Sequence, residues 1–489
     1  MTFNFASAKN GTLTCSCDGK FLHSSYNPEN EAKSFVQNLE LTFCPSTVFI
    51  VEGALSYCVP FLRHRFPQAK LVTIRLFNEF TDYDKDWDNV FYFSSSQFFD
   101  EQLFNYFGEE ELLKSAFFTW KPVELNFPKA VQEVFESIKK AVSKSRDVLY
   151  TRSYFARRWF TNSINNICLL KNSCIINKIE KDILICASGP SLKESIEYIK
   201  KFRESFFIIA VSSAVSVLEY YGIPIDMVLS TDGGYWAKKH IEFNSLKSNP
   251  LWAITDEAAC PSALLNKASV LPLIYPESTG QKLFDALKIP YLFAQRNGTV
   301  SGTALELAMS LTDKNIYFAG LDLQENKGFQ HTQPNKLELI NQNKDKKLSN
   351  KETRITHSRF GSDGSLALYR NWFKTLPESS IKRVFRITCD NSIKGNIAPV
   401  KDIFWDELNL SASGFEPKIK TQKIEINKSQ ILKAVQNLSR TETLEKELFP
   451  LEVIQRDRST DSTEKEKIQN KINEKKQKLL IKIGERING

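Results

Sequence analysis

The stretch Ile183–Leu192 reads I-L-I-C-A-S-G-P-S-L and decides the fold class. Its first residues are apolar or β-branched, as in a buried strand, and the run breaks at Ser188-Gly189-Pro190-Ser191 before a helical pattern begins. A strand, a tight turn and a helix N-terminus in this order are typical of an α/β fold. The sequence therefore predicts a βα unit here.

This turn suits an anion for physical reasons. Backbone N–H groups at the start of a helix have no partner within it, and the helix dipole adds positive potential there. Gly189 allows a ligand to approach the backbone, Pro190 lacks an N–H that the helix would not use, and Ser191 can cap the helix or donate its hydroxyl. A plain buried βα turn has the same residues, so the turn alone leaves both interpretations open.

Further strand patterns alternate with helical patterns up to about Val400. This alternation predicts a Rossmann-like, mostly parallel sheet with right-handed crossovers. Ligands of such sheets bind beyond the carboxyl ends of the strands, where Ser188, Ser212, Asp232 and Asp322 fall. The predicted strands are Ile183–Ala187, Phe206–Val211, Met227–Ser230, Leu251–Ile254, Val270–Tyr275, Asn315–Ala319 and Val384–Thr388.

The chain is expected to have several domains, because 489 residues exceed one ordinary core. Near the N-terminus, Thr47–Gly53 and Lys70–Ile74 flank a helical pattern and predict a smaller α/β domain. Its glycine loop is reduced to Gly53, so no cofactor is expected there. From Pro128 to about Lys178 the pattern is helical. The predicted division is a small α/β domain (1–126), a helical connector (127–178), a catalytic domain (179–405) and a helical, charged C-terminal region (406–489).

Composition narrows the function classes. The chain is 42% hydrophobic and 25% charged, as in soluble globular proteins, and no apolar run is long enough to span a bilayer. The first residues do not resemble an export signal, and nine scattered cysteines in mostly apolar runs are typical of reduced thiols, so we expect a cytoplasmic protein. Cys15 and Cys17 lack a second pair or a nearby His, which makes a zinc site a poor prediction.

Charge is concentrated in the tail. Residues 420–489 hold sixteen Lys and Arg against eleven Asp and Glu, about five of the net charge of +8. Phe449 is the one aromatic residue in this tail, whereas nucleic-acid binding would favour aromatics between the basic residues. We therefore expect no nucleic-acid partner and interpret Glu464–Lys482 as a solvated helix, with docking of a protein partner as the alternative.

A second loop, Asn297-Gly298-Thr299-Val300-Ser301-Gly302-Thr303, opens a predicted helix over Ala304–Leu311. Ile316–Asp322 (I-Y-F-A-G-L-D) follows, then a polar stretch, then Ile355-Thr356-His357-Ser358. Signatures of P-loop enzymes, zinc proteases and α/β-hydrolases are absent from the sequence. The polar stretch Gln333–Arg354 has no apolar period, and we interpret it as a mobile lid, or else a plain surface insertion.

The order G-P-S-L, V-S-G-T-A-L-E-L-A, I-Y-F-A-G-L-D-L, T-H-S resembles the bacterial sialyltransferases that use CMP-activated sugars. It equally resembles the motility-associated factor family of flagellin glycosyltransferases. The first resemblance covers about Ile183 to Val400 and includes Cys389-Asp390-Asn391-Ser392. The second extends to Leu22–Pro28 (L-H-S-S-Y-N-P) with Glu31-Ala32, which resemble the opening signature of that family.

The resemblance implies a role for each matching position. The turn Ser188 to Ser191 would hold the CMP phosphate and ribose, the helix N-terminus would stabilise the leaving phosphate, and Ser301 and Gly302 match a pair that contacts the nucleotide. The sialyltransferases have Asn where this chain has Ser188, so that contact would be shorter or bridged by water. The other implied nucleotide-sugar ligands are Ser212, Ser213, Asp232, Thr299, Asp322, Asn391 and Ser392.

His357 matches the histidine thought to act as general base in the sialyltransferases. An imidazole with an ordinary pKa of about 6.5 is neutral at pH 7 and can accept the proton of an attacking hydroxyl. His331 is the competing candidate, because a comparable His follows the G-L-D motif in the motility-associated family. Asp232 and Asp322 each end a strand, where they would bind sugar hydroxyls, although Asp322 also fits a structural role in its own turn.

The expected function is an inverting glycosyltransferase that moves a nonulosonic acid (pseudaminic, legionaminic or sialic acid type) from CMP to Ser or Thr hydroxyls of flagellin, with no metal or other cofactor required. One alternative is an ATP enzyme resembling the archaeal pterin diphosphokinases, which share a G-x-S-L turn. That enzyme would want a further acidic residue for Mg²⁺ near Asp232, and Ser230-Thr231 supply none. The other alternative is a non-catalytic flagellin-binding or chaperone module.

Overall fold

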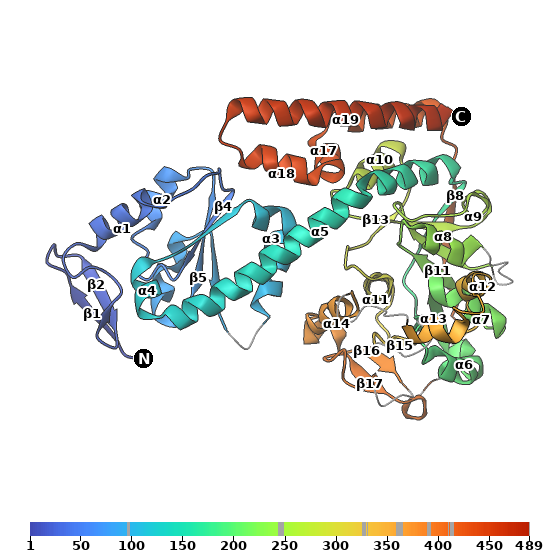
Figure 1. Cartoon of the computed structure of the whole chain (residues 1–489). Coiled ribbons are helices and arrows are strands. Elements are labelled where there is room, and N and C mark those ends of the chain that lie inside the picture. The colour runs from blue at the N-terminus through green and yellow to red at the C-terminus, as the bar shows by residue number, and fades with distance from the viewer. Residues whose placement is uncertain are drawn as a thin grey trace. The chain divides into compact units, whose positions relative to one another are not determined.

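The computed structural model describes residues 1–94, 98–242, 249–324, 329, 331–357, 365–388, 393–408, 410 and 415–488. The chain forms two compact units (Figure 1). Unit 1 comprises Met1–Phe155 with Glu445–Lys478, and unit 2 comprises Ala156–Leu444 with Leu479–Gly489. Two long helices, α5 (Pro128–Leu169) and α19 (Ser462–Asn488), contribute residues to both units. The functional boundaries expected at residues 126, 178 and 405 stay predictions.

Unit 1 contains a parallel sheet in the order β6-β5-β4-β7 and a small antiparallel sheet. The strands β4 (Thr47–Val51) and β5 (Lys70–Arg75) confirm the predicted pair. Every residue of β4 is buried, and alternate residues enter separate cores on the two faces of the sheet. The other elements are β1 (Phe3–Ser7), β2 (Leu13–Cys17), β3 (Lys20–Phe21), α1 (Pro28–Gln37), α2 (Val59–Arg65), η1 (Asn78–Asp86), β6 (Asn89–Tyr92), α3 (Phe99–Leu113), β7 (Ser115–Thr119), α4 (Lys121–Asn126), α17 (Glu442–Leu448) and α18 (Pro450–Arg458).

A buried ion pair lies at the carboxyl edge of the parallel sheet of unit 1. Arg75 donates to Glu52 Oε1 at 2.9 Å, to the Ala54 carbonyl at 2.9 Å and to Asp84 Oδ1 at 2.8 Å. The Glu52 carboxylate also accepts backbone N–H groups, including that of Leu76 at 2.8 Å. The side chains of Arg75 and Glu52 are both fully buried, so these bonds compensate charges that water cannot reach.

Unit 2 is built on one large sheet in the order β17-β16-β15-β9-β10-β11-β12-β13-β8-β18, with β14 beside β13. Its described neighbours pair parallel except β8 and β18. All seven predicted strands are confirmed to within one residue at each end, because each is an apolar run buried on both faces. They are β9 (Asp182–Cys186), β10 (Phe206–Val211), β11 (Met227–Ser230), β12 (Leu251–Thr255), β13 (Val270–Ile274), β15 (Ile316–Ala319) and β16 (Val384–Ile387).

Two helical expectations need correction. The connector was expected to be helical to about Lys178, but α5 ends at Leu169 and Asn172–Ile176 form β8, which enters the large sheet. The C-terminal region contains β18 (Ile419–Lys423), which pairs with β8 in antiparallel register. Each strand completes the other's backbone hydrogen bonds, and such a tertiary pairing has no local sequence signal. The C-terminal region is otherwise helical, as predicted, but α19 buries Ile468, Ile472, Ile483 and Ile487 and is not simply a solvated helix.

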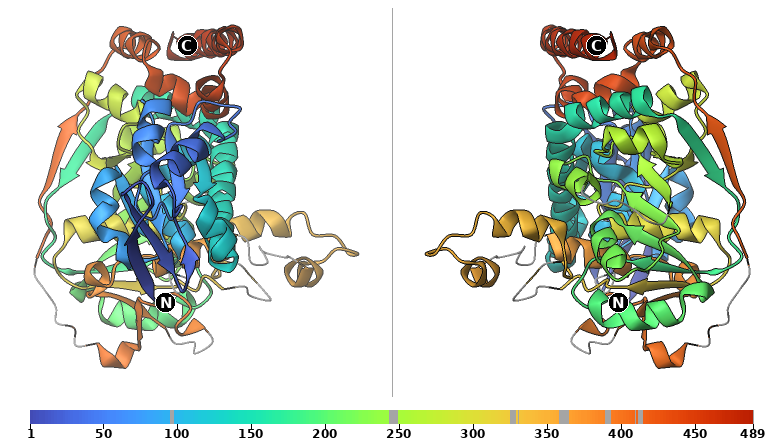
Figure 2. Two further views of the ribbon diagram at one scale, coloured as in Figure 1. Left: turned by 90° about the vertical axis from the view of Figure 1, so that its left-hand side faces the viewer. Right: turned by 90° about the vertical axis from the view of Figure 1, so that its right-hand side faces the viewer.

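The remaining elements of unit 2 connect or flank these strands. Figure 2 shows α12 and α13 standing out from the rest of the unit in both views. The elements are α6 (Leu192–Lys201), η2 (Arg203–Ser205), η3 (Ser212–Ala214), α7 (Val215–Tyr220), α8 (Tyr235–Glu242), α9 (Ser262–Lys267), α10 (Thr279–Leu287), β14 (Leu292–Phe293), α11 (Val300–Leu311), α12 (Lys336–Gln342), α13 (Lys351–His357), α14 (Ser365–Lys374), α15 (Glu378–Ile381), β17 (Lys401–Ile403), η5 (Trp405–Glu407) and α16 (Lys428–Leu438).

The stretch Gln333–Arg354, interpreted from its polarity as a mobile segment, contains α12 and the start of α13. Arg354 joins them by donating to both carboxylate oxygens of Glu338 and to Asp345 Oδ1 at 2.8 Å. Ion pairs therefore hold the two helices together, where an ordinary helical hairpin is held by contacts between apolar faces. This is why a search for an apolar period missed both helices.

The strand order places the topological switch point of the large sheet between β9 and β15. From β9 the chain adds β10, β11, β12 and β13 on one side, and it later adds β15 and β16 on the other. In open α/β sheets the ligand crevice lies at such a switch point, outside the carboxyl ends of the strands. The turn at Ser188 and the G-L-D turn at Asp322 both leave strands at this place.

Candidate functional site

The turns after β9 and β15 are locked together. The Gly189 N–H donates to the Gly320 carbonyl at 2.8 Å, and a Cβ at Gly189 would lie 2.5 Å from that oxygen. Gly320 has a φ of +73°, in the left-handed region that favours glycine. The two backbones approach so closely that both positions require glycine. The packing of the turns therefore explains Gly189 without any ligand.

The carboxylate of Asp322 occupies the N-terminus of α6. Its Oδ2 accepts the Ser191 N–H at 2.9 Å, and its Oδ1 accepts the Ser191 hydroxyl. Both of these bonds go to the neighbouring turn, whereas the sequence led us to expect that Asp322 accepts bonds within its own turn. A phosphate at the Ser191 N–H would have to displace this carboxylate or tolerate its charge. The expectation that this helix start holds the CMP phosphate therefore meets a physical obstacle.

Three side chains form a hydrogen-bonded chain beside this turn. Ser213 Oγ in η3 donates to Ser188 Oγ at 2.8 Å, and Ser188 Oγ lies 2.8 Å from Nδ1 of His331. The Thr332 N–H, next to His331, donates to the Ser188 carbonyl at 2.8 Å. When Nδ1 carries the proton and donates to Ser188, Nε2 presents a lone pair, which is the form a general base needs. His331 therefore lies against the turn Ser188 to Ser191.

His240 on α8 lies against His331. The two ring centroids are 5.8 Å apart and the rings are nearly perpendicular. Burial lowers the pKa of His331, and the hydrogen bond to Ser188 partly offsets this. Burial and the neighbouring His331 lower the pKa of His240 to about 4. Both imidazoles are therefore neutral at pH 7. His240 lies on the helix that follows the T-D-G-G loop, and no sequence motif marks it as a candidate.

Three residues expected in the site cannot be located by their side chains. His357 is the last residue of α13, and the structure describes its backbone alone. Asn391 and Ser392 lie outside the described residues. Their expected roles stay predictions. Ser212 is buried in η3 beside Ser213, and Pro190 is partly exposed within its turn.

The N-terminus of α11 offers a second set of helix-start N–H groups at the same edge of the sheet. Because α11 leads into β15 and runs back along the sheet, its N-terminus lies at the carboxyl edge. Thr299 is the N-cap and its side chain makes no capping bond. Gly302 has no room for a Cβ, which would lie 2.9 Å from Asn297 and 3.0 Å from Trp372. Thr299, Ser301 and Gly302, all expected to contact nucleotide, meet here.

Asp232 is exposed in the loop after β11. Its Oδ1 accepts the Gly234 N–H at 2.7 Å, which shapes the T-D-G-G turn that leads into α8. Burial raises the pKa of Tyr369 on α14, and the negative charge of Asp232 adds to this rise. An exposed carboxylate such as that of Asp232 can bind sugar hydroxyls.

The helix α5 fixes the loops that follow β11 and β12. Asn162 donates to the carbonyls of Gly233 at 3.1 Å and Glu257 at 2.9 Å. Asn166 donates to the carbonyls of Asp256 and Ala258 at 2.7 and 2.9 Å. The four-residue spacing of these asparagines on one helix face is the signal that they act together.

Arg296 fixes the loop that leads into α11. Its guanidinium forms a bidentate pair with Glu257 and lies 4.1 Å from the ring centroid of Tyr275 and 5.3 Å from that of Trp159. A planar guanidinium fixed in this way positions the loop that ends at Asn297. Nothing in the sequence singled out Arg296, since its partners lie far from it along the chain.

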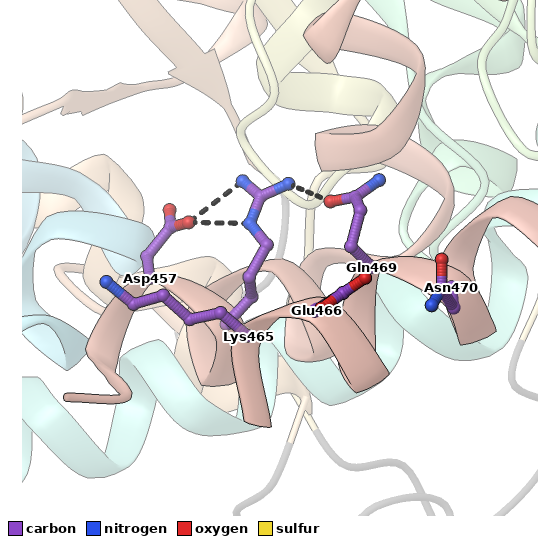
Figure 3. Close-up of a pocket in the computed structure, with 6 residues that line it drawn as sticks. Asp457, Lys465, Glu466, Gln469 and Asn470 are labelled. Carbon is purple, nitrogen blue, oxygen red and sulfur yellow. Dashed lines mark hydrogen bonds and ion pairs between the residues drawn. The ribbon is translucent and has the colours of Figure 1, made fainter. Parts of the chain in front are cut away.

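Other features of the described residues add no second site. No three His, Cys, Asp or Glu side chains in the described ranges are grouped as metal ligands. In the same ranges no helix has both the length and the apolar character of a membrane span. Figure 3 shows a pocket in unit 1 where Arg456 already bonds Asp457 and Gln469, so its charge is compensated by the protein itself. Lys465, Glu466 and Asn470 complete its lining.

Comparisons with known proteins concern the central region and the fold. The family described as 6-hydroxymethylpterin diphosphokinase MptE-like matches residues 157–328. A solved structure, a MAf glycosyltransferase from Magnetospirillum magneticum AMB-1, superposes with a TM-score of 0.56 at 12% identity, covering 99% of this chain and 92% of that one. At this identity the likeness shows a shared fold.

Two curated relatives are uncharacterized proteins of Treponema pallidum (strain Nichols). One is 29% identical over 61% of this chain and 65% of its own length, and the other is 26% identical over 38% and 33%. The match thus spans less than two thirds of either relative. The chain shares its mixed α/β fold, with the large mostly parallel sheet and the helical C-terminal region, with a glycosyltransferase.

Proposed function

We propose that this chain is an inverting glycosyltransferase of the motility-associated factor family, with a sialyltransferase-like catalytic centre, which transfers a nonulosonic acid from CMP to Ser or Thr hydroxyls of flagellin. The observation that carries the proposal is the hydrogen-bonded chain from Ser213 through Ser188 to His331 at the switch point of the sheet. A fold shared with a MAf glycosyltransferase over nearly the whole chain supports it.

The chemistry follows from the position of His331. The acceptor hydroxyl attacks the anomeric carbon, its proton goes to Nε2 of His331, and the bond from that carbon to the CMP phosphate breaks with its electron pair leaving on CMP. Burial holds the pKa of His331 below its usual value, so the base is deprotonated at pH 7. In this proposal His331 takes the role first assigned to His357, because its contacts with the Ser188 turn are defined.

The phosphate of CMP is proposed to lie at the N-terminus of α11. At the start of α6, Asp322 accepts the Ser191 N–H and backbone carbonyls accept the next two N–H groups, whereas the Thr299 side chain makes no capping bond at the start of α11. The N–H groups of Ser301 and Gly302 then stabilise the charge that develops on the leaving phosphate. Asp232 binds hydroxyls of the sugar. No metal and no further cofactor is invoked, and a cytoplasmic location follows from the resemblance and the expected reduced cysteines.

Isothermal titration with CMP, ATP and GTP tests the donor. The proposal predicts that CMP binds and that exchanging Gly302 for Val weakens binding at least tenfold, since a side chain there would displace Asn297 and Trp372. The matched control is Gly484→Val, at a helical glycine with open space around it and outside the site. Tight ATP binding without CMP binding would contradict the proposal.

That contradictory result would instead favour a pterin diphosphokinase-like enzyme, which the family match over residues 157–328 makes the second candidate. Such an enzyme transfers diphosphate from ATP and needs Mg²⁺, so its activity would stop on adding a chelator. A non-catalytic flagellin-binding or chaperone module is the third possibility. It would bind flagellin equally well with and without His331.

A further inference from the structure

The helices α8 and α12 lie in contact beside the proposed base and expose large apolar side chains. Tyr235 and Trp236 begin α8 and are 61% and 50% exposed, and Leu339 on α12 is 54% exposed. Soluble surfaces that gather aromatic and aliphatic side chains in one place mark interaction sites, and Trp and Tyr are the residues that contribute most in such places. We call Tyr235, Trp236, Leu339 and the adjoining Lys344 the α8–α12 face.

This face is connected directly to the proposed base. Trp236 and His240 are four residues apart, so they lie on the same side of α8 about one turn apart. His240 is buried against the His331 ring, with centroids 5.8 Å apart. A chain segment lying over Trp236 is therefore within a few residues' reach of His331. Asp232 is exposed in the loop that precedes α8.

The charge around this face is one-sided. Residues 336–354 hold six Lys and Arg against three Asp and Glu. Glu338 and Asp345 are both bonded to Arg354, so these three charges pair within the hairpin, and five lysines remain against one glutamate. Lys344 lies over the Trp236 ring at 5.7 Å, and Lys346 and Lys347 are exposed in the connection between the two helices. The surface thus combines an apolar centre with a basic rim, which is complementary to an acidic polypeptide that carries an apolar side chain.

The hairpin that supplies the rim has a defined geometry. The pairs of Arg354 with Glu338 and Asp345 join α12 to α13, and Asn335 caps α12 by accepting the Leu337 N–H at 2.9 Å. Figure 2 shows this hairpin standing out from unit 2, as a surface reaching toward a large partner would. A small donor sugar has no need of a projection of this kind.

We propose that the α8–α12 face docks the acceptor polypeptide, an acidic segment with an apolar anchor that sits on Trp236, and so brings its hydroxyl to His331. This inference rests on the proposed function and adds the acceptor's site and chemistry to it. Trp236 is the anchor point, and Lys344, Lys346 and Lys347 attract the acidic flanks. Because the rim acts by charge, binding of the acceptor weakens as salt rises.

The test is acceptor kinetics with purified flagellin of the same organism and a CMP-activated nonulosonic acid, together with CMP titration and acceptor-free hydrolysis of the donor. Trp236→Ala is expected to raise the KM for flagellin at least tenfold while leaving CMP affinity and hydrolysis within about twofold of the unchanged chain. Neutralising Lys344, Lys346 and Lys347 to Gln is expected to raise that KM and to reduce its dependence on salt. The matched control is Tyr220→Ala, an exposed aromatic at the end of α7, where the flagellin KM stays unchanged.

The possible outcomes separate the two proposals. If the unchanged chain neither binds CMP nor hydrolyses the donor, the proposed function fails. If it does both, but Trp236→Ala leaves the flagellin KM unchanged, the docking face is wrong and the proposed function stands. If Trp236→Ala weakens CMP binding or donor hydrolysis instead, the face belongs to the donor and the docking proposal is overturned.

Discussion

Exchanging Asp322 for Asn tests where the nucleotide phosphate lies. The substitution keeps the size of the side chain and removes its negative charge from the start of α6. The amide oxygen can accept only one of the two bonds that Ser191 now donates to the carboxylate. Losing one bond to a charged group lowers the free energy of unfolding by about 1–3 kcal/mol. The fold should survive, and the loss is measurable by urea denaturation.

The effect on CMP binding depends on the site of the phosphate. A phosphate bonded at Ser191 would lie about 4 Å from the Asp322 carboxylate, where two like charges repel by about 4 kcal/mol at an effective dielectric constant of 20. Solvent screening at this partly exposed position leaves about 1–2 kcal/mol, so Asp322→Asn would tighten CMP binding about tenfold. Our account places the phosphate at α11 and predicts a change of less than about threefold.

Isothermal titration with CMP measures this difference, with Asp313→Asn as the control. Asp313 is an exposed carboxylate paired with Lys178 just before β15, at the opposite edge of the sheet, so its removal changes the net charge equally. Tenfold tighter binding by Asp322→Asn, but not by Asp313→Asn, would refute the reasoning that moves the phosphate to α11.

Three further predictions concern the fold and its titration. Gly189→Ala should lower the free energy of unfolding by about 1–3 kcal/mol, because its Cβ would lie 2.5 Å from a backbone carbonyl, whereas Gly484→Ala, with open space inside a helix, should be neutral or stabilising in the same denaturation assay. Burial lowers the pKa of His240 from 6.5 to about 4, so its contribution to stability is complete above pH 6.5 and is lost as the pH falls toward 4. Thermal unfolding measured against pH should show this decline of up to about 3 kcal/mol, and His240→Gln should reduce it. An unchanged pH profile in that variant would contradict the prediction. Arg75→Met should cost about 3–5 kcal/mol by leaving the buried Glu52 unpaired, and adding Glu52→Gln should recover part of the loss; a single variant as stable as the unchanged chain would show that the pair contributes nothing.

Seven strands of the large sheet could be predicted because nearly all of their residues are apolar and buried, as in Phe206–Val211. The edge pair β8 and β18 could not. Asn172–Ile176 and Ile419–Lys423 become strands by pairing with each other across the length of the chain, and neither carries a strong local pattern. The helices of the α12–α13 hairpin were missed for a similar reason, since Arg354 replaces an apolar face.

The sequence predicted which residues lie at the carboxyl edge of the sheet better than it predicted which residues they bond. Ser188 and Asp322 were expected at the carboxyl edge because each ends a strand. That Asp322 caps the neighbouring helix depends on β15 lying next to β9, which only the strand order reveals. His331 meets Ser188 across 143 residues of sequence, and His240 reaches it from a third segment. Chain topology brings these groups together, and motif order alone could not choose between His331 and His357.

The most direct test of the account is transfer of a CMP-activated nonulosonic acid to flagellin, followed by mass spectrometry of the acceptor, with CMP affinity measured on the same preparations. The account predicts that the unchanged chain adds the sugar to Ser or Thr. It predicts that His331→Ala lowers the rate by about 10²-fold or more while CMP affinity stays within about threefold. Transfer at the full rate by His331→Ala, with loss of transfer in His357→Ala, would contradict the account.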